Sequence, residues 1–140
     1  MSDHLILRIV GKFLIPYIML FALYVQFHGD FGPGGGFQAG VIFASAFVIH
    51  TLLFGLESTL RIAPPSVLKV IAASGVLLYA GVGVVSLFAG GNFLDYDYLA
   101  ADPIAGQHIG IILVEFGVGL TVTSVMMLLF FTFAERGEPA

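Results

Sequence analysis

A single carboxyl group interrupts the most apolar stretch near the C-terminus of this sequence. Glu115 is the only charged residue between Gly106 and Phe133. Because an α-helix rises about 1.5 Å per residue, we expect Glu115 about 14 Å along such a helix from Gly106, near the middle of a membrane. A charge at that depth costs about 2.5 to 3.5 kcal/mol, so such a residue usually faces the protein interior and has a function.

Two roles for Glu115 fit this position. Burial favours the neutral form of a carboxyl group, so Glu115 could hold a proton near neutral pH and exchange it when water or Na+ arrives. That is the chemistry of a proton or sodium relay. Alternatively, a protonated Glu115 hydrogen-bonds a neighbouring helix and only joins the two helices. The sequence leaves both roles open.

Histidines and aspartates could continue a proton or sodium path from Glu115 toward the membrane surface. His108 precedes Glu115 by seven residues, so both lie on nearly the same helix face, about 10.5 Å apart along the axis. With His28, Asp30 and Asp102 it is expected near one membrane surface. These residues would form a polar mouth above Glu115, or they are separate interfacial residues in contact with water.

His50 is expected in the inner half of the second helix. It could shuttle protons at physiological pH or serve as a neutral hydrogen-bonding partner. Its depth and that of Glu115 differ by about 7 Å, so direct contact is not expected. No histidine spacing suits a metal, no nucleophile has a base nearby, and the polar groups in the spans are too few to enclose a hard cation. We therefore predict no enzyme, metal centre or cofactor.

The segment of residues 32–40, Gly-Pro-Gly-Gly-Gly-Phe-Gln-Ala-Gly, joins the first two expected helices. Consecutive glycines allow positive φ angles and the close approach of another chain. A phosphate-binding loop would need Lys-Ser/Thr after its last glycine, whereas Phe37 and Gln38 follow here. Gly36, Gly40 and Ala44 instead form a small-xxx-small pattern that predicts close helix packing.

Further glycines recur in the other expected helices. We interpret their number as more than one small bundle needs for close helix contacts, which favours neighbouring subunits. They are Gly75, Gly81, Gly83, Gly110, Gly117 and Gly119.

The composition requires a lipid solvent, because 59% of residues are hydrophobic and only 10% are charged. Long charge-free runs predict a single all-α domain, residues 1–140, with four transmembrane helices at about 5–27, 37–56, 66–89 and 107–133. The absence of cysteine excludes disulfides and thiol catalysis. A net charge of −4 without a basic block argues against a nucleic-acid partner.

The charges fix an orientation. All five basic residues fall on one side of the predicted spans. On the other side, the connections between the first and second and between the third and fourth spans contain Asp but no Lys or Arg. The basic residues are Arg8, Lys12, Arg61, Lys69 and Arg136. By the positive-inside rule that side is cytoplasmic, which places both termini inside and the glycine-rich loop outside. The second outer connection also carries Tyr96 and Tyr98, which suit the membrane interface.

Three segments carry a resemblance to a known family. Residues 30–40 contain Pro-Gly-Gly-Gly-Phe-Gln, residues 42–46 read Ile-Phe-Ala-Ser-Ala, and residues 106–119 contain Leu-Val-Glu. Together they resemble the MnhB (MrpB) family of subunits of the Mrp (Mnh) multisubunit Na+/H+ antiporter.

The resemblance implies a small subunit of a hetero-oligomeric complex in the bacterial inner membrane. Such a complex exports Na+ in exchange for H+, supports sodium tolerance and pH homeostasis, and includes large antiporter-like subunits as partners. It implies Glu115 as the intramembrane acid, with Na+ and H+ as transported ions rather than cofactors. The residues it marks as required for function or assembly are Pro33, Gly34, Gly35, Gly36, Phe37, Gln38 and Gly40.

Three functional hypotheses remain at this point. In the first, Glu115 lines or supports an ion path at an interface with other subunits. In the second, the chain is a purely structural subunit of this complex or of a related membrane-bound hydrogenase. In the third, the chain transports ions alone.

Overall fold

The computed structural model describes residues 4–29, 31–32 and 34–137, and among these it contains helices joined by short connections. Four helices are long and apolar enough to cross a membrane, which confirms the predicted all-α fold with four spans. They are α1 (Leu5–Phe27), α2 (Gly36–Phe54), α4 (Pro65–Phe88) and α5 (Pro103–Gly137). Two short helices, α3 (Leu56–Ile62) and η2 (Tyr96–Leu99), were not expected.

Local sequence explains the helix ends. α2 stops at Gly55, whose φ of 92° suits glycine, and α4 starts at Pro65, a residue tolerated in a first helical turn. α5 is 35 residues long and extends beyond the expected range at both ends. Its early start follows from Asp102, whose Oδ1 accepts a hydrogen bond from the Ile104 N–H at 3.3 Å and so caps the helix.

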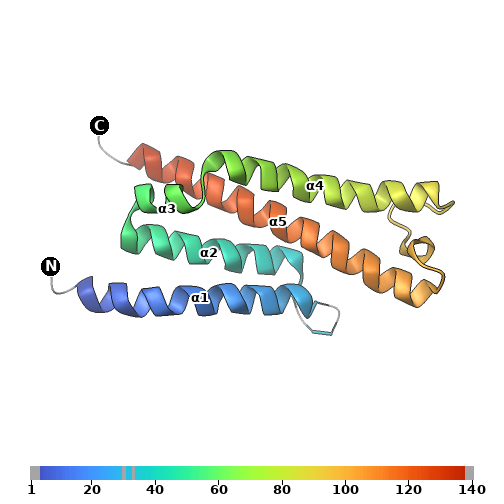
Figure 1. The fold of residues 1–140 in the computed structure, drawn as a ribbon, viewed down its shortest axis with the longest axis horizontal. Helices are drawn as coiled ribbons and strands as arrows, with labels where there is room; N and C mark the ends of the chain where they lie inside the picture. The colour runs from blue at the N-terminus through green and yellow to red at the C-terminus, as the bar shows by residue number, and fades with distance from the viewer. Residues whose placement is uncertain (1–3, 30, 33, 138–140) are drawn as a thin grey trace.

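The four long helices form a single layer in the order α1, α2, α5, α4 (Figure 1). α1 packs on α2, α2 on α5, and α5 on α4, so the chain consists of two hairpins joined along the contact between α2 and α5. Only 11 to 28% of each most apolar stretch is buried. Most side chains therefore face outward, toward lipid or neighbouring helices.

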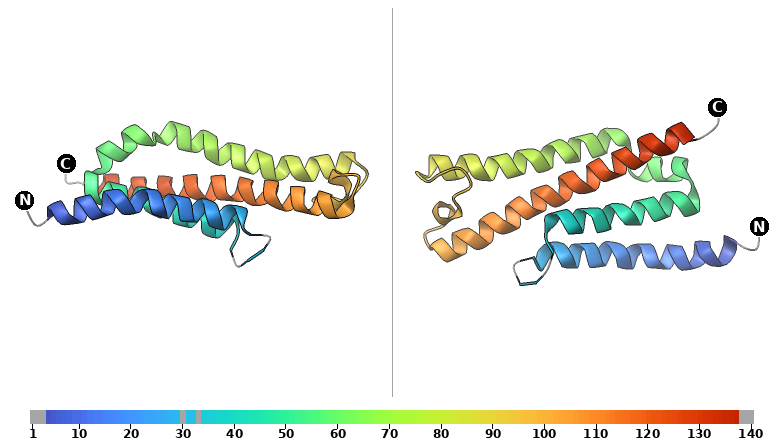
Figure 2. Two further views of the ribbon diagram at one scale, coloured as in Figure 1. Left: turned by 60° about the horizontal axis from the view of Figure 1, so that its bottom comes forward. Right: turned by 180° about the vertical axis from the view of Figure 1, so that it is seen from behind.

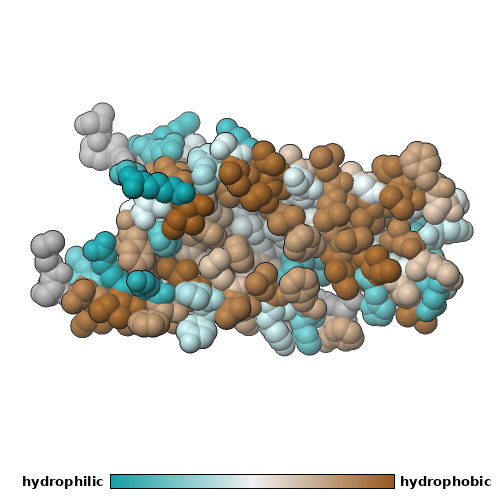
Figure 3. All heavy atoms as spheres, in the orientation of Figure 1, coloured by the Kyte–Doolittle hydropathy of each residue, from teal (hydrophilic) through white to brown (hydrophobic). Residues whose placement is uncertain are grey.

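The two ends of the layer differ in chemistry. α1 begins and α5 ends at the same end, where α3 also lies (Figure 1), and hydrophilic residues gather there (Figure 3). We call this the basic end, because Arg8, Lys12, Arg61, Lys69 and Arg136 lie in the helical turns nearest to it. The opposite end, with residues 28–35 and 89–102, is the acidic end. Which side of the membrane each end faces stays a prediction.

At the acidic end, α1 and α2 stop short of α4 and α5 (Figures 1 and 2). Residues 89–102 lie over the longer pair, with Phe93 against Gly83 and Tyr96 against Gly110. The α1–α2 loop is therefore recessed beside α5 and does not reach its tip.

The glycines of the helices pack inside this chain. A methyl group on Gly75 would lie 2.5 Å from the Gly117 carbonyl oxygen, and one on Gly40 would lie 3.0 Å from the Gly119 carbonyl oxygen. Of the glycines that we expected at contacts with other subunits, only Gly81 has no described atom within 4 Å of the position that a methyl group would take. Their number is therefore no evidence for neighbouring subunits, because the glycines of α5 serve its close approach to α4 on one side and to α2 on the other.

Candidate functional site

The carboxyl group of Glu115 lies inside the glycine-rich loop. A methyl group on Gly29 would lie 2.5 Å from Glu115 Oε2, and one on Gly35 would lie 2.8 Å from Glu115 Oε1. The loop can surround the carboxyl group only because these positions carry no side chain. Two segments about 80 positions apart in the sequence thus meet at one acid.

The main chain of Glu115 is equally close to α2. A methyl group on Gly36 would overlap the Glu115 carbonyl oxygen and lie 3.1 Å from its Cα. The neighbouring Gly34 has a φ of 115°, a conformation that suits glycine. Glu115 is therefore held where α1 and α2 end, and not halfway along them as its depth on α5 suggested. The cause is the greater length of α4 and α5.

Two helix ends flank this carboxyl group. Gly29 follows the last turn of α1, and Gly36 begins α2. The start of α2 carries partial positive charge, which stabilises a carboxylate, while the carbonyl groups ending α1 favour a cation. Gln38 Oε1 accepts the Gly35 N–H at 3.1 Å and so holds the first turn of α2 in place.

Tyr96 lies near the acid, and Tyr79 of α4 lies near Tyr96. The pKa of the Tyr96 phenol is raised, first by burial and then by negative charge at Tyr79 and Glu115. The phenol therefore stays protonated at physiological pH and can donate a hydrogen bond. The sequence indicates only an interfacial role for Tyr96, and it gives no sign of Tyr79, because tyrosine is unremarkable in an apolar helix.

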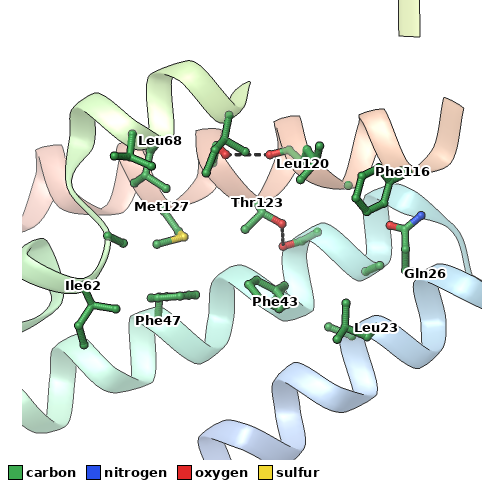
Figure 4. Close-up of a pocket in the computed structure, with 18 residues that line it drawn as sticks. Leu23, Gln26, Phe43, Phe47, Ile62, Leu68, Phe116, Leu120, Thr123 and Met127 are labelled. Carbon is green, nitrogen blue, oxygen red and sulfur yellow. Dashed lines mark hydrogen bonds between the residues drawn. The ribbon is translucent and has the colours of Figure 1, made fainter. Parts of the chain in front are cut away.

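Gln26 extends the site toward the basic end. Its side chain is only 9% exposed, and a methyl group on Gly119 would overlap its Oε1. It borders an apolar cavity of about 300 Å³ between the helices that continues to Met127 (Figure 4). Sequence reasoning missed Gln26, although a lone amide in the charge-free run before Asp30 was a usable signal.

The chain matches a family model over residues 6–128, described as a domain related to the MnhB subunit of a Na+/H+ antiporter. It belongs to the MnhB family. Two relatives from Staphylococcus aureus, strains Newman and JH1, are each described as an antiporter subunit, mnhB2. Each is 33% identical over 129 residues, which cover 90% of this chain and 91% of the relative.

The remaining candidate residues of this MnhB-family chain do not all converge. The exposed His28 ring stacks on Tyr24 at 5.0 Å and lies 5.9 Å from the Phe31 ring. His108 is exposed on α5, two turns from Glu115 toward the acidic end. Asp30 and Pro33 lie outside the described residues, so the polar mouth stays a prediction. Phe37 is exposed on the first turn of α2.

His50 belongs to a separate polar cluster near the basic end. Its Nδ1 lies 2.8 Å from Thr59 Oγ1, and the Thr51 hydroxyl donates to the same Thr59 oxygen at 3.0 Å. His50 is about 21 Å along α2 from Gly36, so it does not contact Glu115, as expected. The cluster gives His50 a hydrogen-bonding partner within the chain, and a role in proton transfer stays a prediction.

Thr59→Val tests whether this cluster holds α2 and α3 together. Thr59 is fully buried, and its loss removes the partner of His50 Nδ1, while Thr51 keeps its hydrogen bond to the Phe47 carbonyl. We expect the free energy of unfolding to fall by about 1 to 3 kcal/mol, measured as thermal stability of the purified complex. Thr132→Val is the control, because the exposed Thr132 hydroxyl only bonds the Leu128 carbonyl in its own helix. Equal stability of the two variants would contradict the proposed role.

Proposed function

We propose that this MnhB-family chain is a non-catalytic subunit of a hetero-oligomeric monovalent cation/proton antiporter, and that Glu115 is a step on its ion path. The complex would export Na+ in exchange for H+ and so support sodium and pH homeostasis. One observation carries the proposal: the Glu115 carboxyl group lies in the loop between the end of α1 and the start of α2. Irregular backbone at membrane depth is tolerated where protein buries it or where it lines a water-filled cavity.

Two neighbouring groups act on the charge of Glu115. The partial positive charge at the start of α2 favours a carboxylate, and the Tyr96 phenol lies near enough to interact with it electrostatically. In the proposed function this carboxyl group receives a proton and passes it on. The recess at the acidic end brings the loop within reach of water from that side, so the proton has a route in and out.

The charge pattern suggests how the chain is oriented in the membrane, and the single layer of helices suggests what covers it. We place the basic end in the cytoplasm of a bacterium, which puts both termini inside and the recess outside. A layer one helix thick leaves two broad faces. Lipid and the other Mrp subunits, among them the large antiporter-like subunits, would cover them.

Glu115→Gln tests this function in vesicles that contain the whole complex. The amide keeps the shape of the carboxyl group but cannot ionise, so we expect Na+-dependent ΔpH to fall about tenfold or more at normal complex abundance. Glu135→Gln is the control, because Glu135 is exposed near the end of α5.

Two results would contradict the role of Glu115 in ion movement. Unchanged exchange would make this chain a structural subunit of this complex or of a related hydrogenase-type complex. Loss of the complex together with exchange would show that the carboxyl group serves assembly.

A further inference from the structure

Oxygen atoms of several kinds border the space beside Glu115. A methyl group on Gly29 would lie 2.5 Å from Glu115 Oε2 and 3.1 Å from the Gly34 carbonyl oxygen, so both oxygens face one small volume. A methyl group on Gly35 would lie 2.8 Å from Glu115 Oε1 and 3.9 Å from Gln38 Oε1. Carboxylate, carbonyl and amide oxygens thus all lie at the junction of α1 and α2.

A second pair of oxygens lies one helical turn deeper. A methyl group on Gly119 would overlap Gln26 Oε1 and lie 3.5 Å from the Gly36 carbonyl oxygen. The Gln26 side chain is nine-tenths buried and borders the cavity between the helices. An amide oxygen beside such a space can accept a hydrogen bond from water or coordinate a cation.

We propose that the junction of α1 and α2 is a binding site for Na+, with Glu115, the Gly34 carbonyl and Gln38 as ligands, and Gln26 with the Gly36 carbonyl as the next position inward. Oxygen ligands of this kind suit hard cations. This inference rests on the proposed function, because it names the place where the exported ion is held.

The electrostatics of the junction suit a small cation. Glu115 supplies one negative charge, and the carbonyl groups at the end of α1 add partial negative charge. Where a transmembrane helix is interrupted, unwound carbonyl groups can coordinate Na+ in the same way. The polar side chains of the spans alone are too few to enclose such an ion, but the glycine-rich loop supplies main-chain oxygens that a count of side chains leaves out.

Gly29→Ala tests the site without removing any ligand. Its methyl group would occupy the space that Glu115 Oε2 and the Gly34 carbonyl share. Gly32→Ala is the control in the same loop, because its methyl group would only approach the edge of the His28 ring, at 3.3 Å. The measurement is the number of ²²Na+ ions bound per purified complex at saturation, for both variants and for Glu115→Gln.

We expect Gly29→Ala and Glu115→Gln each to bind one Na+ fewer than the wild type, and Gly32→Ala to bind the same number. Unchanged binding in both test variants would overturn the Na+ site. If Glu115→Gln then still lost exchange, the proposed function would stand, with Glu115 carrying protons only. If Na+ binding were lost while exchange stayed normal, the site would be supported and the role of Glu115 in transport would fail.

Discussion

Alanine at Gly36 is expected to prevent the complex from accumulating, because the new methyl group would overlap the Glu115 carbonyl oxygen. A main-chain atom cannot swing away as the end of a side chain can, so α2 and α5 must separate. Overpacking of this kind costs about 3 kcal/mol, and here it opens the contact that joins the two hairpins. Complex abundance on native gels measures the effect.

Gly35→Ala is the matched control for Gly36→Ala. Gly35 has a φ of −157°, an extended conformation that any residue adopts, and its methyl group would meet only side-chain atoms of Glu115 and Gln38. We expect normal complex abundance with reduced exchange, since the carboxyl group has to move. Normal abundance of Gly36→Ala would mean that α2 and α5 do not pack through this glycine.

Gly75→Ala is expected to disrupt the other main contact of α5 to a similar extent. The methyl group would lie 2.5 Å from the Gly117 carbonyl oxygen and 3.0 Å from the Thr121 nitrogen, both main-chain atoms. Moving α4 away would also break the hydrogen bond from the Thr121 hydroxyl to the Ala72 carbonyl, 3.1 Å long. We expect a loss of about 3 kcal/mol and a sharp fall in complex abundance.

Gly81→Ala is the control on the same helix. Nothing lies within 4 Å of its missing side chain, and alanine favours a helix more than glycine does. Its abundance should match or slightly exceed that of the wild type. Equal losses from Gly75→Ala and Gly81→Ala would point to a general intolerance of α4 rather than to its crossing with α5.

Hydropathy and helix-breaking residues were enough to predict most of the helices. Charge-free runs located four spans, and Pro64 and Pro65 marked the break before α4. α3 was missed because it is only seven residues long and carries Glu57 and Arg61, which resemble a solvated connection. The order of the helices in the layer could not be predicted, because hydropathy does not say which apolar face meets which.

The sequence predicted the acid of the candidate site but not the residues around it. Glu115 was apparent because an isolated charge in an apolar helix is costly. Its surroundings were not, since Gly29 and Gly36 meet it across a long sequence separation. Its expected depth relied on α5 alone, whereas the shorter α1 and α2 decide what lies beside it. Counting glycines also misled, because a count does not distinguish contacts within a chain from contacts between chains.

The arrangement of two hairpins in one layer has a consequence for folding. α1 with α2 and α4 with α5 are neighbours in sequence, so each pair closes a short loop and can form soon after membrane insertion. The contact between α2 and α5 joins distant segments and forms last. Glu115 and the glycine-rich loop come from different hairpins. The carboxyl group therefore meets its loop only in the final step, and a chain that has inserted but not closed lacks the proposed ion site.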